Sequence, residues 1–176
     1  MSLKARFSLQ CGFSLIEVMV AVVIIAIGLL GNAGMMALVQ NNTAIARFRG
    51  LGAIEADSLA SMMHANALYW QSPAVPSSGS GFSIAGTTIS DATLNGQAID
   101  CTTAPCTSVQ MAGYDLKQWG LSLASLLPTG TGQVKCSIVA ATPVSCVISI
   151  SWNENNMMLN QSGTSVTQSY TLVVQP

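Results

Sequence analysis

A run of almost wholly apolar residues from Phe13 to Val39 constrains this chain more than any other feature. About 20 such residues in a helix are enough to cross the hydrocarbon core of a bilayer. Residues 1–12, which precede the run, carry Lys4 and Arg6 and no acid, so this end is expected to stay in the cytoplasm while the remainder is exported. The pattern predicts a single membrane-spanning helix near the N-terminus.

Glu17 lies near the start of this apolar run, where neither of two common interpretations accounts for it. A cleaved signal peptide has an apolar stretch of only about 7–15 residues. A plain signal anchor explains the length but gives no reason for an acid. A carboxylate costs roughly 2.5–3.5 kcal/mol at the centre of a membrane helix and less near its end, so it normally has a partner. The simplest alternative is a headgroup-level carboxylate favoured by the helix dipole.

The segment Gly12-Phe13-Ser14-Leu15-Ile16-Glu17 resembles the prepilin peptidase motif of type IV pilins and type II secretion pseudopilins. The resemblance implies that residues 1–12 are a leader and that the peptidase cuts between Gly12 and Phe13. Phe13 then becomes the N-methylated N-terminus. Glu17, fifth in the mature chain, would neutralise the α-ammonium group of a neighbouring subunit. Two details differ from the commoner pattern: Ser14 replaces a threonine, and the twelve-residue leader is somewhat long.

The helical pattern continues beyond the apolar run. Apolar residues recur mostly at intervals of three and four, which predicts one buried stripe made of Ile45, Phe48, Leu51, Ile54, Leu59 and Met62. Glu55 is assigned with other polar residues to the remaining faces. The helix is expected to run from near Phe13 to about Tyr69 and to end before Pro73. Residues 13–40 would form its membrane or filament-core half, and residues 41–72 its amphipathic half.

Gly28, Gly31 and Gly34 lie inside this predicted helix, where each glycine costs about 1 kcal/mol relative to alanine. Two interpretations stay open. Small residues at such spacing allow close packing between membrane helices. The resemblance to type IV pilins instead implies a segment that unwinds when the subunit moves from the bilayer into the filament.

Four of the five cysteines fall in the C-terminal half as two local pairs, and Cys11 lies in the leader. An even number beyond an export signal favours disulfides in an oxidising compartment. The expected pairs are Cys101–Cys106, across a short loop with Pro105, and Cys136–Cys146, facing each other in a hairpin. A zinc site is the rival interpretation, but neither pair is C-x-x-C and the single histidine, His64, is distant in sequence.

Residues 73–176 are expected to form a small α+β head. Residues Phe82–Ile89 predict one short strand, and Ala112–Leu127 predict a second helix with Trp119 in the core and Asp115 solvated or capping. Three further segments rich in β-branched residues predict strands: Gln133–Ala140, Val144–Trp152 and Val166–Val174. Together they predict an antiparallel sheet of three or four strands packed against the long N-terminal helix.

The C-terminal half resembles the minor pilins of the PilV kind. The resemblance rests on the Cys101-x4-Cys106 loop, the pattern Asp115-Leu116-x-x-Trp119 and the turn Leu126-Leu127-Pro128-x-Gly130, followed by a late strand ending at Trp152. It implies a low-abundance subunit of a type IV pilus that helps to start assembly near the tip. Its partners would be other minor pilins, the major pilin, the prepilin peptidase and the inner-membrane assembly platform. The head would lie in the periplasm first and then on the extracellular pilus.

Two other functions were weighed. A minor pseudopilin of a type II secretion or DNA-uptake system would share the N-terminal motif. A membrane-tethered enzyme is disfavoured because the chain has one histidine, few acids and no G-x-S-x-G motif. Only 7% of residues are charged and the net charge is −1, against roughly 25% charged residues in typical soluble domains. No nucleic acid partner, cofactor or metal is therefore expected.

Intact-mass measurement of the membrane-extracted protein tests the predicted processing. The native chain should begin at Phe13, carry one added methyl group and have lost four cysteine hydrogens to disulfides. A Gly12→Ala variant should keep the full-length mass, because the peptidase would no longer recognise the junction. A native protein that still begins at Met1, or a Gly12→Ala variant processed like the native chain, would contradict the prediction.

Overall fold

The computed structural model describes residues 12–76, 81–137, 143–156 and 164–176. The chain consists of two compact units, Met1–Asn42 and Thr43–Pro176. The second unit is called the head below. A single long helix, α1 (Leu15–Ala65), contributes residues to both units. Among the described residues, it is also the one helix long and apolar enough to cross a membrane.

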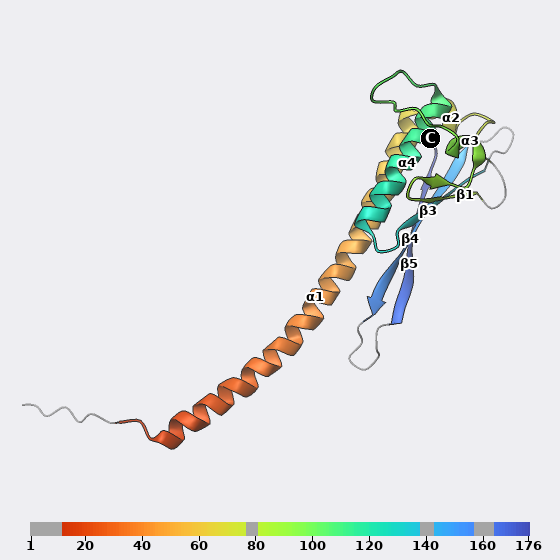
Figure 1. Cartoon of the computed structure of the whole chain (residues 1–176). Helices are drawn as coiled ribbons and strands as arrows, with labels where there is room; N and C mark the ends of the chain where they lie inside the picture. Colours follow the sequence, from red (N-terminus) through yellow and green to blue (C-terminus); the bar gives the residue numbers. More distant parts are fainter. Residues whose placement is uncertain (1–11, 77–80, 138–142, 157–163) are drawn as a thin grey trace, which may run out of the picture. The chain divides into compact units, whose positions relative to one another are not determined.

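The head combines the end of α1 with three shorter helices and one five-stranded antiparallel sheet in the order β2-β1-β3-β4-β5 (Figure 1). The elements are α2 (Ala67–Trp70), β1 (Phe82–Ala85), β2 (Thr88–Ile89), α3 (Ala92–Asn95), α4 (Ser108–Leu126), β3 (Thr131–Ser137), β4 (Ser145–Asn156) and β5 (Thr164–Val174). The predicted α+β class, with a long N-terminal helix and a short second helix, is confirmed. The predicted number of strands is wrong by at least one.

The additional strand comes from residues Phe82–Ile89, which form a hairpin and not one strand. Gly86 has a φ of 55°, a left-handed conformation that glycine adopts without steric cost, and it reverses the chain between β1 and β2. Ile84 of β1 then pairs with Ile89 of β2. The β-branched residues of both arms read as one continuous strand in sequence, which is why the turn was missed.

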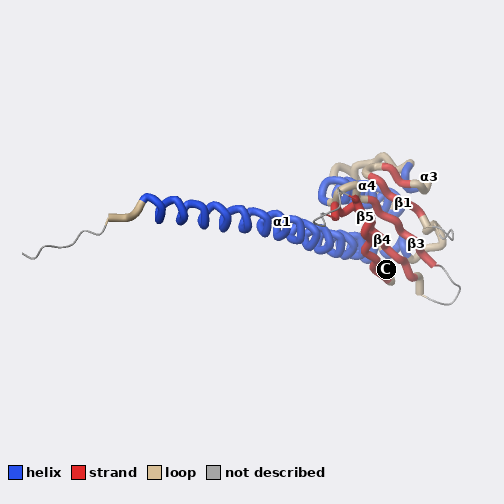
Figure 2. Tube along the Cα trace, turned by 90° about the horizontal axis from the view of Figure 1, so that it is seen from below, coloured by secondary structure: helices blue, strands red, loops and turns tan. Residues whose placement is uncertain are grey.

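Strands β3, β4 and β5 follow the prediction closely, and Figure 2 shows the strands side by side. Cys136 pairs directly with Cys146 across β3 and β4. Strand β4 continues past Trp152 to Asn156 and β5 begins at Thr164, so this hairpin is longer than expected. The predicted residues 138–140 of the first strand and most of its turn lie outside the described residues.

The predicted helix over Ala112–Leu127 is present as α4 but begins four residues earlier. The Gln110 side chain accepts a hydrogen bond from the Thr107 N–H at 2.9 Å, which satisfies one of the free donors at the helix start. Trp119 is buried, with 1% of its surface exposed, as the sequence predicted. The buried face of α4 consists of Ala112, Gly113, Leu116, Trp119, Gly120 and Leu123.

The part of α1 that belongs to the head follows the predicted stripe only in part: Leu59 is buried, and Phe48 and Leu51 pack against the core. Ile54 is 64% exposed, whereas Ala56, Leu59 and Met63 are fully buried. The buried positions include small residues because neighbouring elements approach this side of the helix closely: a Cβ atom on Gly52 would lie 3.0 Å from the Trp152 ring. Glu55, assigned to a polar face, is also buried. Apolar spacing alone therefore found part of the buried face, but it wrongly included Ile54 and missed Ala56 and Glu55.

Helix α1 ends at Ala65, four residues before the predicted end. Asn66 leaves the helical conformation and its side-chain amide donates to the Ser108 carbonyl at 2.8 Å. The short helix α2 then places Tyr69 and Trp70 in the core. Burial, together with the negative charge of Asp91, raises the pKa of Tyr69 to about 12. The break at Asn66 thus changes the direction of the chain, so that Tyr69 and Trp70 are buried in the core.

The contact between α4 and the β1–β2 hairpin generates a stability prediction. A Cβ atom at Gly120 would overlap the Gly86 carbonyl oxygen and the Ile84 side chain. Gly120→Ala should therefore lower the free energy of unfolding of the head by about 1–3 kcal/mol, as overpacking does. Gly50→Ala is the matched control, since nothing lies within 4 Å of a Cβ atom there, and it should raise stability by about 0.5–1 kcal/mol. Denaturant unfolding of the full chain in detergent measures both, and equal effects would contradict the packing described.

Candidate processing and assembly site

The described part of the first unit begins at the residues that the sequence singled out. Gly12, Phe13 and Ser14 precede α1, and the Ser14 carbonyl accepts hydrogen bonds from the Glu17 and Val18 N–H groups at 3.0 and 3.3 Å. Ser14 therefore starts the helix, and Glu17 lies in its first turn. A negative charge there interacts favourably with the positive end of the helix dipole.

The apolar side chains of this unit are exposed along its whole described length. Between Phe13 and Val39, every large apolar side chain that the structure describes is at least half exposed, from 52% at Val20 to 83% at Phe13. Soluble proteins rarely expose continuous apolar surface of this extent. The segment must therefore be covered by lipid, by other polypeptides, or by each in turn.

The Glu17 carboxylate lies within this apolar surface and forms no ion pair with any residue in the described parts of the chain. Lys4 and Arg6 lie outside the described residues. A carboxylate surrounded by lipid or by other apolar helices would need a cation for stability. The geometry leaves the side chain available for such a group.

Gly28, Gly31 and Gly34 all lie within the continuous helix α1. A Cβ atom built on any of the three would meet nothing within 4 Å. No contact inside the described chain therefore requires glycine at these positions. The two interpretations, close approach of another helix and local unwinding, both place the reason in a neighbouring molecule or in a different state.

Residues 7–31 match a family model described as the prokaryotic N-terminal methylation motif. The chain carries the N-terminal motif of the type IV prepilin and pseudopilin superfamily. The matched residues include the Gly12–Phe13 junction and Glu17. Searches among curated proteins and among solved structures found no match to the chain.

A prepilin motif followed by an apolar helix is consistent with anchoring in a membrane before assembly. It implies processing by a prepilin peptidase and later association with partners in a pilus-type assembly. Within the head, two sets of polar contacts connect the end of α1 to other elements.

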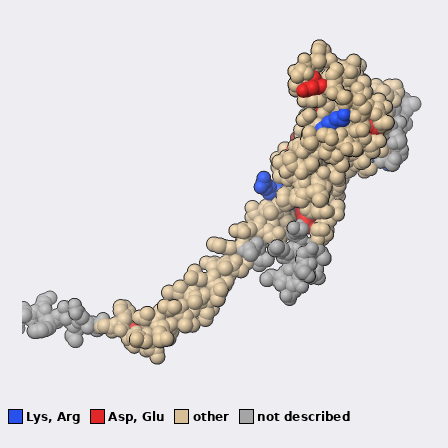
Figure 3. Space-filling model, in the orientation of Figure 1, with Lys and Arg blue, Asp and Glu red and all other residues tan. Residues whose placement is uncertain are grey.

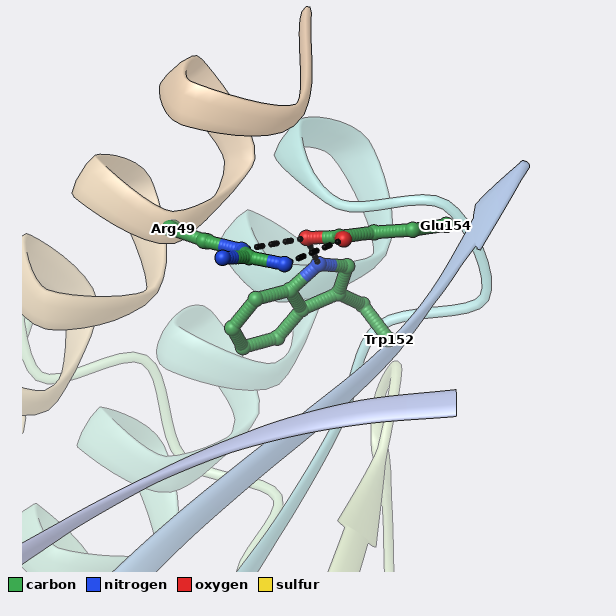
Figure 4. A network of polar contacts seen from close by, with 3 residues as sticks. All are labelled: Arg49, Trp152 and Glu154. Atoms are coloured by element: carbon green, nitrogen blue, oxygen red, sulfur yellow. Dashed lines mark hydrogen bonds and ion pairs between the residues drawn. The ribbon is translucent and has the colours of Figure 1, made fainter. Parts of the chain in front are cut away.

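One set of polar contacts connects α1 to β4 (Figure 4). The Arg49 guanidinium group donates to both carboxylate oxygens of Glu154, at 3.3 and 3.1 Å, and the Trp152 indole N–H donates to the same carboxylate at 3.0 Å. Glu154 is only 4% exposed, whereas Arg49 is mainly exposed. The hydrogen bond and charge of Glu154 raise the pKa of Arg49. The buried acid thus has all the partners that its charge needs.

A second set connects α1 to α4. The Trp119 indole N–H donates to the Glu55 backbone carbonyl at 2.9 Å, and the Ser122 hydroxyl donates to the Glu55 carboxylate at 2.8 Å. Both indoles of these contacts are buried, and each has a partner for its N–H. The sequence placed Glu55 in solvent and assigned no partner to Glu154. The only sequence signal for the burial of these two acids is that each lies within four residues of core positions, and this signal is weak.

Two disulfides are present in the head. Cys101–Cys106 closes a loop before α4, and Cys136–Cys146 joins β3 to β4. Just before the first loop, Asp100 accepts hydrogen bonds from the hydroxyl and N–H groups of Thr102, which lower the pKa of Asp100. Within the described residues, no three His, Cys, Asp or Glu side chains gather as a metal site would require.

Asp115 lies in the middle of α4, so it does not cap the helix. It is half-buried and lines an open cleft of about 520 Å³. The cleft is also lined by residues of the α1–α2 turn and of the first disulfide loop: Met62, Ala65, Asn66, Leu68, Cys106, Thr107, Ser108 and Met111. Burial raises the pKa of Asp115 to about 6.

The described head surface has few charges. Figure 3 shows only scattered basic and acidic groups on the face in view. His64, the single histidine, is exposed on α1.

The raised pKa of Asp115 predicts how head stability depends on pH. Between its ordinary value of 3.8 and about 6, the folded head holds a proton that the unfolded chain has lost. Stability should therefore fall as the pH rises through this window and stay lower above it. Asp115→Asn should remove the loss and stabilise the head on the order of 1 kcal/mol at pH 7, a value reduced for partial exposure.

Thermal unfolding of both proteins from pH 4 to pH 7 measures this effect. The two curves should converge near pH 4 and separate above it. Asp57→Asn, at an exposed position of α1, controls for the change in net charge. A constant difference between Asp115→Asn and the native chain at all pH values would contradict the assignment.

Proposed function

We propose that this protein is a minor pilin of a type IV pilus, of the PilV kind, that joins other minor pilins to initiate pilus assembly near the tip. The observation that carries the proposal is Glu17, a carboxylate without a described ion-pair partner in a helix whose apolar side chains are exposed. Such a helix needs a lipid or protein environment, and its acid needs a cation within that environment.

The proposed cation is the α-ammonium group of a neighbouring subunit. In this mechanism the peptidase cuts between Gly12 and Phe13, and Phe13 is then N-methylated. Methylation leaves the amine charged, so a salt bridge with the fifth residue of another subunit remains possible. The pair would form only when two helices are in the correct axial register, which makes it a device for specific assembly as well as for neutralisation.

The proposed organisation follows from this chemistry. Residues 1–12 form the leader, 13–40 the membrane and filament-core half of the helix, 41–72 the amphipathic part with the end of α1 and with α2, and 73–176 the globular part. The protein would first cross the inner membrane once, with its head in the periplasm, and would later be displayed on the extracellular pilus. Its partners would be other minor pilins, the major pilin, the peptidase and the assembly platform.

Features of the head support the narrower assignment to a minor pilin of the PilV kind. The Cys101–Cys106 loop precedes α4, and Trp119 of that helix donates to the backbone of α1. These are the residues through which the sequence resembles that subgroup. A pseudopilin would share the N-terminal chemistry, so deletion of the gene separates the two: loss of pili supports the proposal, and loss of protein secretion with normal pili contradicts it.

Substitution of Glu17 tests the proposed salt bridge. Glu17→Ala should be cleaved and methylated normally, yet its incorporation into pili should fall at least about tenfold because a charged pair in an apolar environment is lost. Glu17→Asp keeps the charge and should retain part of the function. Asn32→Ala, at another polar position of the same helix, is the control for membrane insertion. Quantitative immunoblots of sheared pili and membranes give the measurement, and normal incorporation of Glu17→Ala would refute the salt bridge.

A further inference from the structure

Strand β5 forms one edge of the sheet. All its residues from Thr164 to Val174 pair with β4, and no described strand pairs with its other side. In an antiparallel strand, about half of the backbone N–H and C=O groups point to each side. An eleven-residue edge therefore presents a long row of hydrogen-bonding groups away from β4. The opposite edge, β2, is only two residues long.

This edge has none of the features that usually prevent another strand from adding to it. Proteins protect such edges with lysines, prolines, bulges or inward-pointing charges. The sequence from Thr164 to Val174 contains no charged residue and no proline. Its pairing with β4 runs without a skipped residue from Cys146–Val174 to Asn156–Thr164, so there is no bulge. The edge is long, regular and uncharged.

The core layer beneath the sheet also stops short at β5. Ile148 and Ile150 of β4 are fully buried, but the residues paired with them, Leu172 and Tyr170, remain partly exposed although they pack against the same core. One more strand with apolar residues facing this layer would cover both side chains. The incomplete burial of Leu172 and Tyr170 therefore indicates that an added strand should carry apolar residues at the positions next to these two side chains.

We propose that the free edge of β5 binds an extended, uncharged segment of a partner polypeptide, which adds as a sixth strand. Backbone hydrogen bonds would supply affinity, and alternating apolar side chains that cover Tyr170 and Leu172 would supply selectivity. The edge lies within the head and does not involve the Glu17 contact. The choice of a different polypeptide over a second copy of this chain rests on the proposed function, in which the protein assembles with other minor subunits.

A peptide with a suitable pattern provides the test. The probe is a synthetic copy of residues 144–152 with serine in place of Cys146, because residues 146–152 already pair with β5 and include alternating apolar residues. The control peptide has the same composition with the alternation destroyed. Amide hydrogen exchange of the full chain in detergent should slow in residues 164–174 when the probe is added, and the control peptide should have no effect there.

Two variants of β5 make the test specific. Leu172→Lys places a charge on the side of the strand that faces the core layer and should weaken probe binding at least tenfold. Val173→Lys adds the same charge at a neighbouring position that is 63% exposed, and it should change binding by less than about twofold. Circular dichroism checks that both variants fold. If Leu172→Lys does not fold, the exchange experiment on the native chain with the probe and control peptides tests the proposal alone.

Each result has a distinct consequence. Slower exchange confined to β5, lost in Leu172→Lys, supports strand addition. No binding of the probe, protection elsewhere in the head, or equal binding by both lysine variants overturns it. Self-association of the native chain without peptide, abolished by Leu172→Lys, would show that a second copy occupies the edge and would overturn the assignment to a different partner. None of these results depends on whether Glu17→Ala affects pili.

Discussion

Two buried tryptophans hold the part of α1 that lies in the head. One donates a hydrogen bond to the backbone of α1, and the other donates to a carboxylate that also binds a side chain of α1. Trp119 donates to the Glu55 carbonyl, and Trp152 donates to Glu154, which also binds Arg49. Large aromatic rings contribute most of the apolar area buried at such a contact, while the N–H groups fix its orientation because each needs a partner when buried. The two contacts lie on different elements, α4 and β4, so together they define how the helix is held.

The same helix meets an opposite requirement in the first unit. Its large apolar side chains there have no described cover, whereas Leu59 and Met63 in the head are fully buried. A single regular element can serve both environments because helix geometry satisfies its own backbone hydrogen bonds in lipid and in a protein core alike. What differs is only the side chains: an apolar surface all round in one part, and one buried stripe in the other. The same helix therefore presents an exposed apolar surface in the first unit and a buried stripe in the head.

Much of this organisation could be predicted from sequence, and the successes share a cause. The apolar run, the Gly12–Phe13 junction and Glu17 form a local pattern, and residues 7–31 match the corresponding family model. Helix α4 and strands β3 to β5 were found because their periodicity and their Pro, Gly and Ser boundaries lie within short segments. The opposite placement of Cys136 and Cys146 followed from counting outward from one turn. Local features of this kind do not depend on knowing the neighbours.

The sequence by itself thus determined the class of the fold, the long apolar helix and the motif at its start, because each is encoded by residues close together in the chain. Only the tertiary structure decided which face of α1 is buried, that Glu55 and Glu154 lie inside, that Asp115 borders a cleft and that β5 ends the sheet. The stripe on α1 depends on how closely α4 and β4 approach, and small residues such as Ala56 and Gly52 mark that approach without revealing it in sequence. A buried acid is stable only because of partners from distant segments, 67 residues away for Glu55 and 105 for Glu154, and no local pattern encodes those pairings.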